Sequence, residues 1–110
     1  MLGDPDEGYL YVRENKRFVK VCIDEIIYIE GVGEYIQIFT EKRKIVTKKG
    51  LNEFEKKLPQ SGFLRIHKSH IVNLSKIEAF TAQTIEVHGK VLIIGRGFKD
   101  EVSEALKKFR

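Results

Sequence analysis

The side chains best suited to contact another molecule are gathered in one stretch of the chain. Between the apolar ends of residues 63–73 lie Arg65, His67, Lys68, Ser69 and His70. If this stretch is a strand, a turn and a strand, its apolar side chains enter a core and residues 67–70 are held out to solvent. Long basic and hydroxyl-bearing side chains on an anchored turn are suited to contact DNA phosphates and base edges. A polar turn that merely joins two strands would account for the same residues equally well.

Arg96 is the second candidate for DNA contact. It stands between two glycines after the apolar stretch 90–94, and glycine lets a backbone approach a partner closely. Arginine is the best bidentate reader of guanine in the major groove. Lys99, on the first turn of the helix expected next, would reach a phosphate if the acidic residues that follow it face away. The hypothesis requires Lys68 and Arg96 to project from the same side of the molecule.

Enzymatic and metal-binding functions are disfavoured. Neither His67 nor His70, the two histidines that flank Ser69, has a carboxylate in the local sequence to orient it for catalysis, and no glycine-framed nucleophile turn is present. The three histidines and the single cysteine lack the spacing of a structural zinc site. We therefore expect no enzymatic activity, no metal site and no cofactor.

Other polar residues have a structural interpretation. Arg65, among apolar neighbours, is expected to extend across the sheet surface or to pair with a carboxylate. Asn73, at a strand end, is expected to bond local backbone, and His88 to occupy a turn beside Gly89. A basic cluster would add phosphate contacts if it shares a face with the main turn, although such runs are usually just solvated. The cluster consists of Lys42, Arg43, Lys44, Lys48 and Lys49.

Length and composition predict one globular domain. The chain has 110 residues, 42% hydrophobic and 33% charged, so a core can form without metal or disulfide staples. Cys22, the only cysteine, lies in an apolar run and is interpreted as a small core residue. The net charge of +4 permits an anionic partner without proving one.

Residues 1–8 are expected to be a flexible linker or a cut end, and residues 9–110 the domain. No signal peptide and no run of membrane-spanning length is found, so a cytoplasmic location without membrane contact is predicted.

Repeated short apolar stretches between tight turns predict an antiparallel β fold. Strands are expected at 9–13, 18–21, 26–30, 35–40, 44–47, on both sides of the turn in 63–73, and at 76–80, 84–87 and 90–94. The stretch 26–30 is almost wholly apolar, which indicates a central strand buried on both faces. A short helix is expected over 51–58, stopped by Pro59, and a final helix over about 98–109. The apolar stripe of the final helix would be Phe98, Val102, Ala105, Leu106 and Phe109.

Together these features resemble the LytTR-type DNA-binding domain of bacterial response regulators. The resemblance covers about Phe18 to Leu106. Its most specific part is the motif in which Phe63 leads to Arg65, His67, a variable polar residue and Ser69, and then to valine and asparagine. The other anchors are the stretch 26–30, Tyr35 after a short loop at residues 31–34, the helix at 51–58 and the strand end at Arg96.

The resemblance implies an elongated, mainly antiparallel β fold that inserts loops into successive major grooves and bends the duplex. By position, Lys68 and Arg96 would read bases, with Tyr35 also near the bases. His67 and Ser69 would contact phosphates, and Lys99 would join them.

The resemblance also implies partners. The expected function is sequence-specific double-stranded DNA binding by a transcription regulator of the two-component type. Two copies would bind repeated half-sites, and a receiver domain would be present in the full-length protein or as a separate chain. The alternative is a protein-interaction module that binds a partner regulator without reading bases. The operator, the regulated genes and the upstream signal stay open.

Overall fold

Antiparallel strands form most of the regular structure in the computed structural model, which describes residues 2–4 and 8–110. The strands are β1 (Leu2–Asp4), β2 (Tyr9–Glu14), β3 (Arg17–Cys22), β4 (Ile26–Val32), β5 (Tyr35–Thr40), β6 (Lys44–Lys48), β7 (Phe63–His67), β8 (His70–Asn73), β9 (Ile77–Phe80), β10 (Thr84–Val87) and β11 (Lys90–Ile93). The helices are α1 (Leu51–Glu55) and α2 (Lys99–Leu106). Short 3₁₀ turns are η2 (Ile23–Glu25), η3 (Leu74–Lys76), η4 (Arg96–Phe98) and η5 (Lys107–Phe109).

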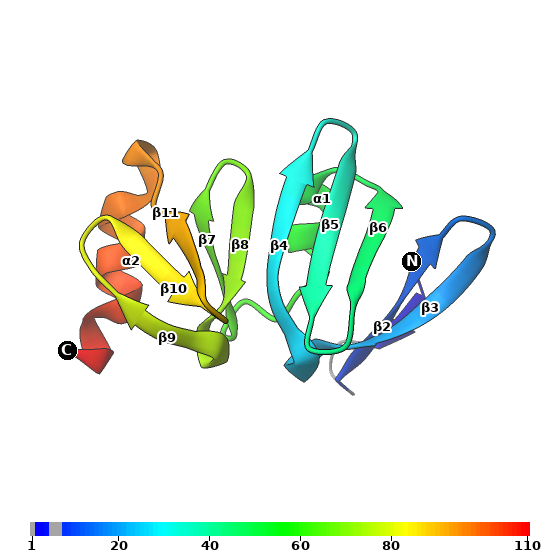
Figure 1. Ribbon diagram of the computed structural model, residues 1–110, viewed down its shortest axis with the longest axis horizontal. Coiled ribbons are helices and arrows are strands. Elements are labelled where there is room, and N and C mark those ends of the chain that lie inside the picture. The colour runs from blue at the N-terminus through cyan, green and yellow to red at the C-terminus, as the bar shows by residue number, and fades with distance from the viewer. Residues whose placement is uncertain (1, 5–7) are drawn as a thin grey trace.

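The strands form three antiparallel sheets arranged along the molecule (Figure 1). The middle sheet has five strands in the order β6-β5-β4-β8-β7, with β1-β2-β3 at one end and β11-β10-β9 at the other. The principal extents are 42 × 29 × 24 Å, so the elongated, mainly antiparallel fold expected from the sequence is confirmed.

Strand β4 lies at the centre of the middle sheet and divides the core in two. A β-bulge opposite β5 interrupts the alternation of β4, so Ile26 and Ile29 face one cluster while Ile27 and Tyr28 face the other. The first cluster receives β2, β3 and α1, and the second receives β10, β11 and α2. The prediction of a central strand buried on both faces is therefore confirmed.

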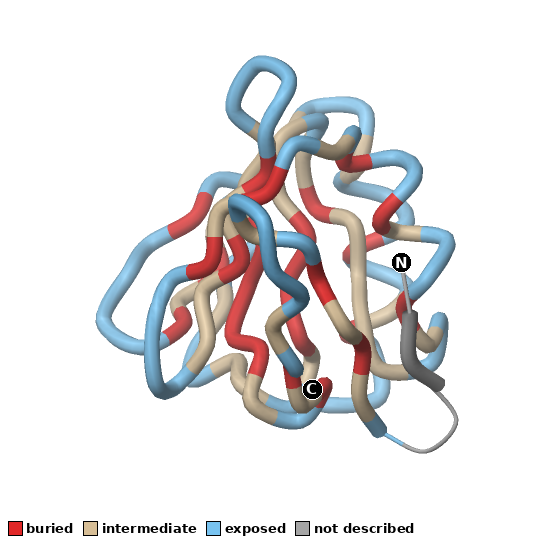
Figure 2. The backbone as a smooth tube through the Cα atoms, turned by 90° about the vertical axis from the view of Figure 1, so that its right-hand side faces the viewer, coloured by how far each residue is buried: buried red, intermediate tan, exposed pale blue. Residues whose placement is uncertain are grey.

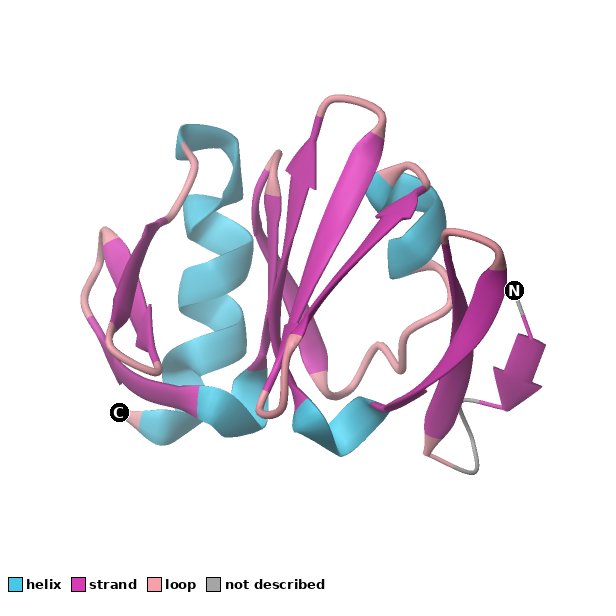
Figure 3. Ribbon diagram, turned by 45° about the vertical axis from the view of Figure 1, so that its right-hand side comes forward, coloured by secondary structure: helices cyan, strands magenta, loops and turns pink. Residues whose placement is uncertain are grey.

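Each face of the middle sheet carries one helix (Figure 3). The short helix ends at Glu55, three residues before the predicted end, but Leu58 stays buried and continues its apolar face. The final helix buries Val102 and Leu106, whereas Phe109 is 58% exposed and does not join the predicted stripe. The reason is that α2 gives way to the 3₁₀ turn η5 before Phe109, which changes the direction of its side chain.

Buried segments follow the strands and the turns between them are exposed (Figure 2). Most buried residues are hydrophobic, but Asn73 is polar and buried, and its amide donates to the Ile26 carbonyl at 2.8 Å. Its side-chain oxygen accepts from the amide nitrogen of Ser75 at 3.0 Å. The first bond joins β8 to β4, and the second is the expected bond to local backbone, so the structural interpretation of this asparagine is confirmed.

Several boundaries differ from the expected ones. Gly31 and Val32 belong to β4, so the β4–β5 turn consists of Gly33 and Glu34 alone. Leu2–Asp4 pairs with β2 as a strand, whereas a linker was expected there; residues 1 and 5–7 of the expected linker lie outside the described residues. In the described ranges, no helix is long and apolar enough to cross a membrane.

Candidate nucleic-acid interface

Three turns lie along one edge of the molecule, the upper edge in Figure 1. They are the β4–β5 turn, the β7–β8 turn with Lys68 and Ser69, and η4, which begins with Arg96. The β5–β6 turn lies at the opposite edge. The segments that carry the two predicted base-reading residues therefore project from the same side, as the hypothesis requires.

Backbone hydrogen bonds join these three turns to one another. The amide of Gly95 donates to the Ile66 carbonyl at 2.8 Å, which fixes the start of η4 against β7. The amide of Gly31 donates to the Ser69 carbonyl at 2.9 Å, which fixes the β7–β8 turn against β4. Because main-chain bonds hold the turns, their spacing does not depend on flexible side chains.

Gly95 allows a close approach within the protein. A Cβ atom built at this position would lie 3.1 Å from the Phe98 ring and 3.2 Å from Cδ2 of His67. A Cβ atom at Gly97 would have nothing within 4 Å. The two glycines were expected to let the backbone approach a partner, and the structure assigns the first one instead to contact between η4 and β7.

Arg65 holds the β7–β8 turn in place through hydrogen bonds of its guanidinium. Its Nε donates to the His67 carbonyl at 2.8 Å and one terminal nitrogen donates to the Lys68 carbonyl at 2.5 Å. The other terminal nitrogen donates to Oδ1 of Asn52 at 2.9 Å and to Oε1 of Glu55 at 2.8 Å. The expected pairing with a carboxylate is confirmed. The guanidinium also ties the turn to α1, a link that sequence reasoning missed.

His67 shapes the turn with its own ring. The amide of Ser69 donates to Nδ1 of His67 at 3.0 Å. Since Nδ1 accepts this bond, the neutral ring carries its proton on Nε2, where it can donate to an acceptor outside the protein. The Lys68 side chain is exposed, while His67 and Ser69 are half-buried.

His70 is not held out to solvent as expected. It lies on β8 directly opposite Glu30 of β4, with Nε2 3.3 Å from the carboxylate, and its side chain is only 17% exposed. Burial lowers the pKa of His70, although the Glu30 carboxylate opposes that effect. Its Nδ1 is buried without a hydrogen-bond partner among the described residues. The two-residue turn leaves only Lys68 and Ser69 beyond the strands, so His70 pairs within the sheet.

Tyr35 is the first residue of β5 and 48% of its surface is exposed. It pairs with Val32 across the β4–β5 turn and with Lys48 of β6. The side chain thus lies at the base of the β4–β5 turn, next to a lysine that no sequence pattern connects with it.

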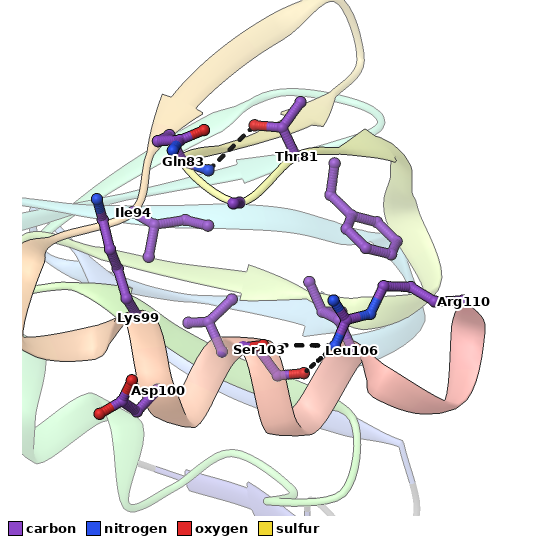
Figure 4. A pocket seen from close by; sticks show the side chains of 11 residues that line it. Thr81, Gln83, Ile94, Lys99, Asp100, Ser103, Leu106 and Arg110 are labelled. Atoms are coloured by element: carbon purple, nitrogen blue, oxygen red, sulfur yellow. Dashed lines mark hydrogen bonds between the residues drawn. The ribbon is translucent and has the colours of Figure 1, made fainter.

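Arg96 is exposed at the start of η4, and Lys99 is exposed at the start of α2. Lys99 also lines a cavity of about 340 Å³ between α2 and the β9–β10 turn (Figure 4). In that view its side chain extends beside Ile94 toward Gln83. Arg96 and Lys99 therefore lie within one short segment, and Lys99 also borders the sheet formed by β9, β10 and β11.

The expected basic cluster is divided between two edges. Lys42 and Arg43 lie in the β5–β6 turn, away from the three turns, while Lys48 ends β6 at the opposite end of that strand. Lys42 also pairs with Glu25 at 3.4 Å, and Arg43 pairs with Glu14. The hairpin geometry separates residues that are close in sequence, so only the Lys48 end can act with the main turn.

Comparisons with known proteins agree with this arrangement. Residues 16–107 match the sequence model of the LytTR family, the LytTr DNA-binding domain. The sensory transduction protein LytT of Bacillus anthracis is 30% identical over 95 residues, which are 81% of this chain and 39% of that protein. The transcriptional regulatory protein NatR of Bacillus subtilis is 30% identical over 77 residues, 70% of this chain and 33% of NatR. The chain thus spans well under half the length of these relatives.

A solved structure shows the same fold. The LytTr DNA-binding domain of a Bacillus cereus response regulator superimposes with a TM-score of 0.77 at 23% identity. The match covers 90% of this chain and 96% of that domain. The fold is therefore shared across nearly the whole length of both.

Proposed function

The chain belongs to the LytTR family of DNA-binding domains, and from this premise we propose that it binds double-stranded DNA sequence-specifically as part of a transcription regulator. The observation that carries the proposal is the joining of two basic turns at one edge. Arg96 follows directly after Gly95, whose amide is bonded to β7 one residue before His67. A duplex lying along this edge meets both turns at once.

The proposed roles follow from exposure and chemistry. Lys68 and Arg96 are exposed and long enough to reach base edges in a major groove. His67, through its Nε2 proton, and the Ser69 hydroxyl contact phosphates. Tyr35 lies near the bases at the neighbouring turn. Lys99 adds a phosphate contact at the start of α2, where the helix dipole also favours an anion.

The assembly on DNA is also part of the proposal. The long axis of 42 Å exceeds one helical turn of B-DNA, roughly 34 Å, so turns spread along it can enter successive grooves. Two copies bind repeated half-sites, and a receiver domain in the same or another chain controls them. The domain itself performs no catalysis, needs no cofactor and acts in the cytoplasm.

Selection from a random duplex library tests this function. We expect a motif to be recovered, because base contacts discriminate among sequences whereas phosphate contacts do not. Affinity for that motif should fall steeply with salt. Recovery of no motif at low salt would contradict the proposal.

The second candidate is a protein-interaction module. Val91 and Ile93 are 56% and 65% exposed on β11, the edge strand of the third sheet, where another chain could pair. This candidate predicts no enrichment in the same selection and a stable complex with a partner regulator.

A further inference from the structure

A groove lies beside the candidate interface, between the β2–β3 hairpin and strands β5 and β6. It has a volume of about 380 Å³. Its lining consists of Arg13, Glu14, Asn15, Tyr35, Val46, Thr47 and Lys48. Because Tyr35 and Lys48 are cross-strand neighbours, the groove is continuous with the β4–β5 turn.

The groove offers positive charge and hydrogen-bond donors. Arg13, on β2, and Lys48, on β6, are exposed residues of the lining, and Tyr35 is the cross-strand neighbour of Lys48. The Nε of Arg13 donates to the Asn15 carbonyl at 3.3 Å, and its guanidinium carbon lies 6.0 Å from the centre of the Phe18 ring. Among the described residues its terminal nitrogens make no hydrogen bond, so they can donate to an anion. A guanidinium and an ammonium on residues that line the same groove are suited to bind a phosphate.

The acidic residue in the lining does not cancel this charge. One carboxylate oxygen of Glu14 pairs with Arg43, and the other accepts from the Val46 amide at 3.3 Å. The hydrogen bond from Arg43 holds the pKa of Glu14 below its usual value, so the charged pair is already complete. Lys16 and Arg17, exposed in and after the hairpin turn, add further positive charge beyond the groove.

From this geometry we propose that the groove binds a DNA backbone phosphate outside the bases read by the three turns. The inference rests on the proposed function and extends it. The DNA contact would continue from η4, along the β7–β8 and β4–β5 turns, to the β2–β3 hairpin. Arg13 and Lys48 hold the phosphate, and Lys16 and Arg17 attract the flanking backbone.

Alanine variants at Arg13 and Lys48 test the inference, with Lys44→Ala as the matched control. Lys44 is an exposed lysine on the same strand as Lys48 but at its other end, so the change in charge and strand composition is the same. The probes are the duplex recovered by selection, the same duplex shortened on one flank, and a scrambled duplex of equal length.

We expect Arg13→Ala and Lys48→Ala each to reduce the slope of log affinity against log salt by about one unit on all full-length probes. The preference for the selected motif over the scrambled duplex should not change. On the shortened duplex that lacks the flanking phosphate, variants and wild type should bind alike. Ethylation interference should identify the flanking phosphate in wild type and lose it in both variants.

Two results would overturn the inference. One is an unchanged salt slope and interference pattern in both variants while wild type still recognises its motif, which would leave the proposed function standing. The other is an equal effect of Lys44→Ala, which would show that only net charge matters. Failure of wild type to select any motif would instead reject the proposed function, and the inference with it.

Discussion

The amide nitrogen of Gly95 lies 2.8 Å from the carbonyl oxygen of Ile66 and donates to it. This bond joins the segment between β11 and η4 to β7, the edge strand of the middle sheet, beside the β7–β8 turn. Ile66 is the bulged residue of β7, since Arg65 pairs with Ile71 and His67 with His70. Since β7 is the edge strand of the middle sheet, it presents backbone groups that no neighbouring strand pairs, and the Ile66 carbonyl at the bulge accepts the bond from Gly95. This hydrogen bond to the edge strand thus fixes η4 beside the β7–β8 turn.

The first prediction concerns the space at Gly95. Gly95→Ala should reduce the free energy of unfolding by about 1–3 kcal/mol, because the added methyl group would press on the rings of Phe98 and His67. Its backbone φ of −65° suits any residue, so crowding is the only cause. The same crowding should move η4 away from β7 and weaken binding to the selected duplex. Chemical denaturation and titration with that duplex measure the two effects.

Gly97→Ala is the control for this substitution. A Cβ atom there meets nothing within 4 Å, and the φ of this residue is not in the left-handed region. Stability should change little. Equal stability and DNA affinity for the two variants would show that the contact between η4 and β7 does not set the spacing of the turns.

The second prediction concerns the clamp that Arg65 forms below the β7–β8 turn. Arg65→Lys keeps a positive charge near Glu55 but cannot donate to both the His67 and Lys68 carbonyls. We expect a loss of unfolding free energy of about 1–3 kcal/mol. We also expect a weaker preference for the base that Lys68 reads, with non-specific binding retained. Binding to a panel of single-base variants of the selected duplex gives the preference directly.

Glu55→Gln separates the two roles of this arginine. Glutamine keeps an oxygen at the position that accepts from Arg65 at 2.8 Å, so the hydrogen bonds from Arg65 to the His67 and Lys68 carbonyls should remain in place. Base preference should then match wild type even if stability falls. A base preference equally weak in both variants would mean that Arg65 acts on the fold as a whole and not on the turn.

The third prediction is a pH dependence that His70 causes. Its pKa in the folded protein is lowered from the ordinary value of 6.5, mainly by burial. As pH falls below that value the unfolded chain takes up the proton first, so the folded state loses stability. The contribution of His70 to the free energy of unfolding should be fully present above about pH 6.5. It should decline below that pH and level off once His70 is protonated in the folded protein as well. Urea denaturation across this range measures the slope.

His70→Gln should remove the His70 share of this slope, because glutamine keeps a donor for Glu30 without titrating. The control is His88→Asn, since His88 is exposed in a turn and asparagine tolerates its φ of 45°. If His70→Gln retained the full slope and His88→Asn lost it, the assignment to burial at the sheet edge would be wrong.

The order of strands was predictable because apolar stretches and turn residues alternate clearly along the chain. The predicted strands at 35–40 and 84–87 have the observed bounds, and Ile85 and Val87 are fully buried as expected. The motif in residues 63–73 identified the family from sequence. These successes share a cause: local pattern determines which residues pair and which face a core.

The arrangement of the site was less predictable because it depends on contacts between distant segments. Nothing near Arg65 in sequence shows that Asn52 and Glu55 face it from α1. The prediction that His70 is exposed to solvent was wrong, because the turn is shorter than expected and Glu30 lies opposite His70 in the sheet. The hairpin between β5 and β6 likewise separates Lys42 from Lys48 in space, although only five residues lie between them in the sequence.

The last prediction concerns base reading itself. Lys68→Ala and Arg96→Ala should each cost about 1–3 kcal/mol on the selected duplex and relax preference at one base position each. Both side chains are exposed, so neither truncation should lower stability measurably. Quantitative binding to single-base variants of the duplex, for wild type and each variant, locates the base that each residue reads.

Ser69→Ala is the matched comparison, because it removes the phosphate contact proposed for the same turn. It should weaken binding to selected and scrambled duplexes by the same factor, since phosphates are alike in every sequence. The Lys68 and Arg96 variants should lose preference at different positions, because the two residues lie on separate segments, which the hydrogen bond of Gly95 to Ile66 joins. If Arg96→Ala left both the affinity and the base preference of the selected duplex unchanged, Arg96 would not be a base-reading residue, and the edge formed by the three turns would need another partner.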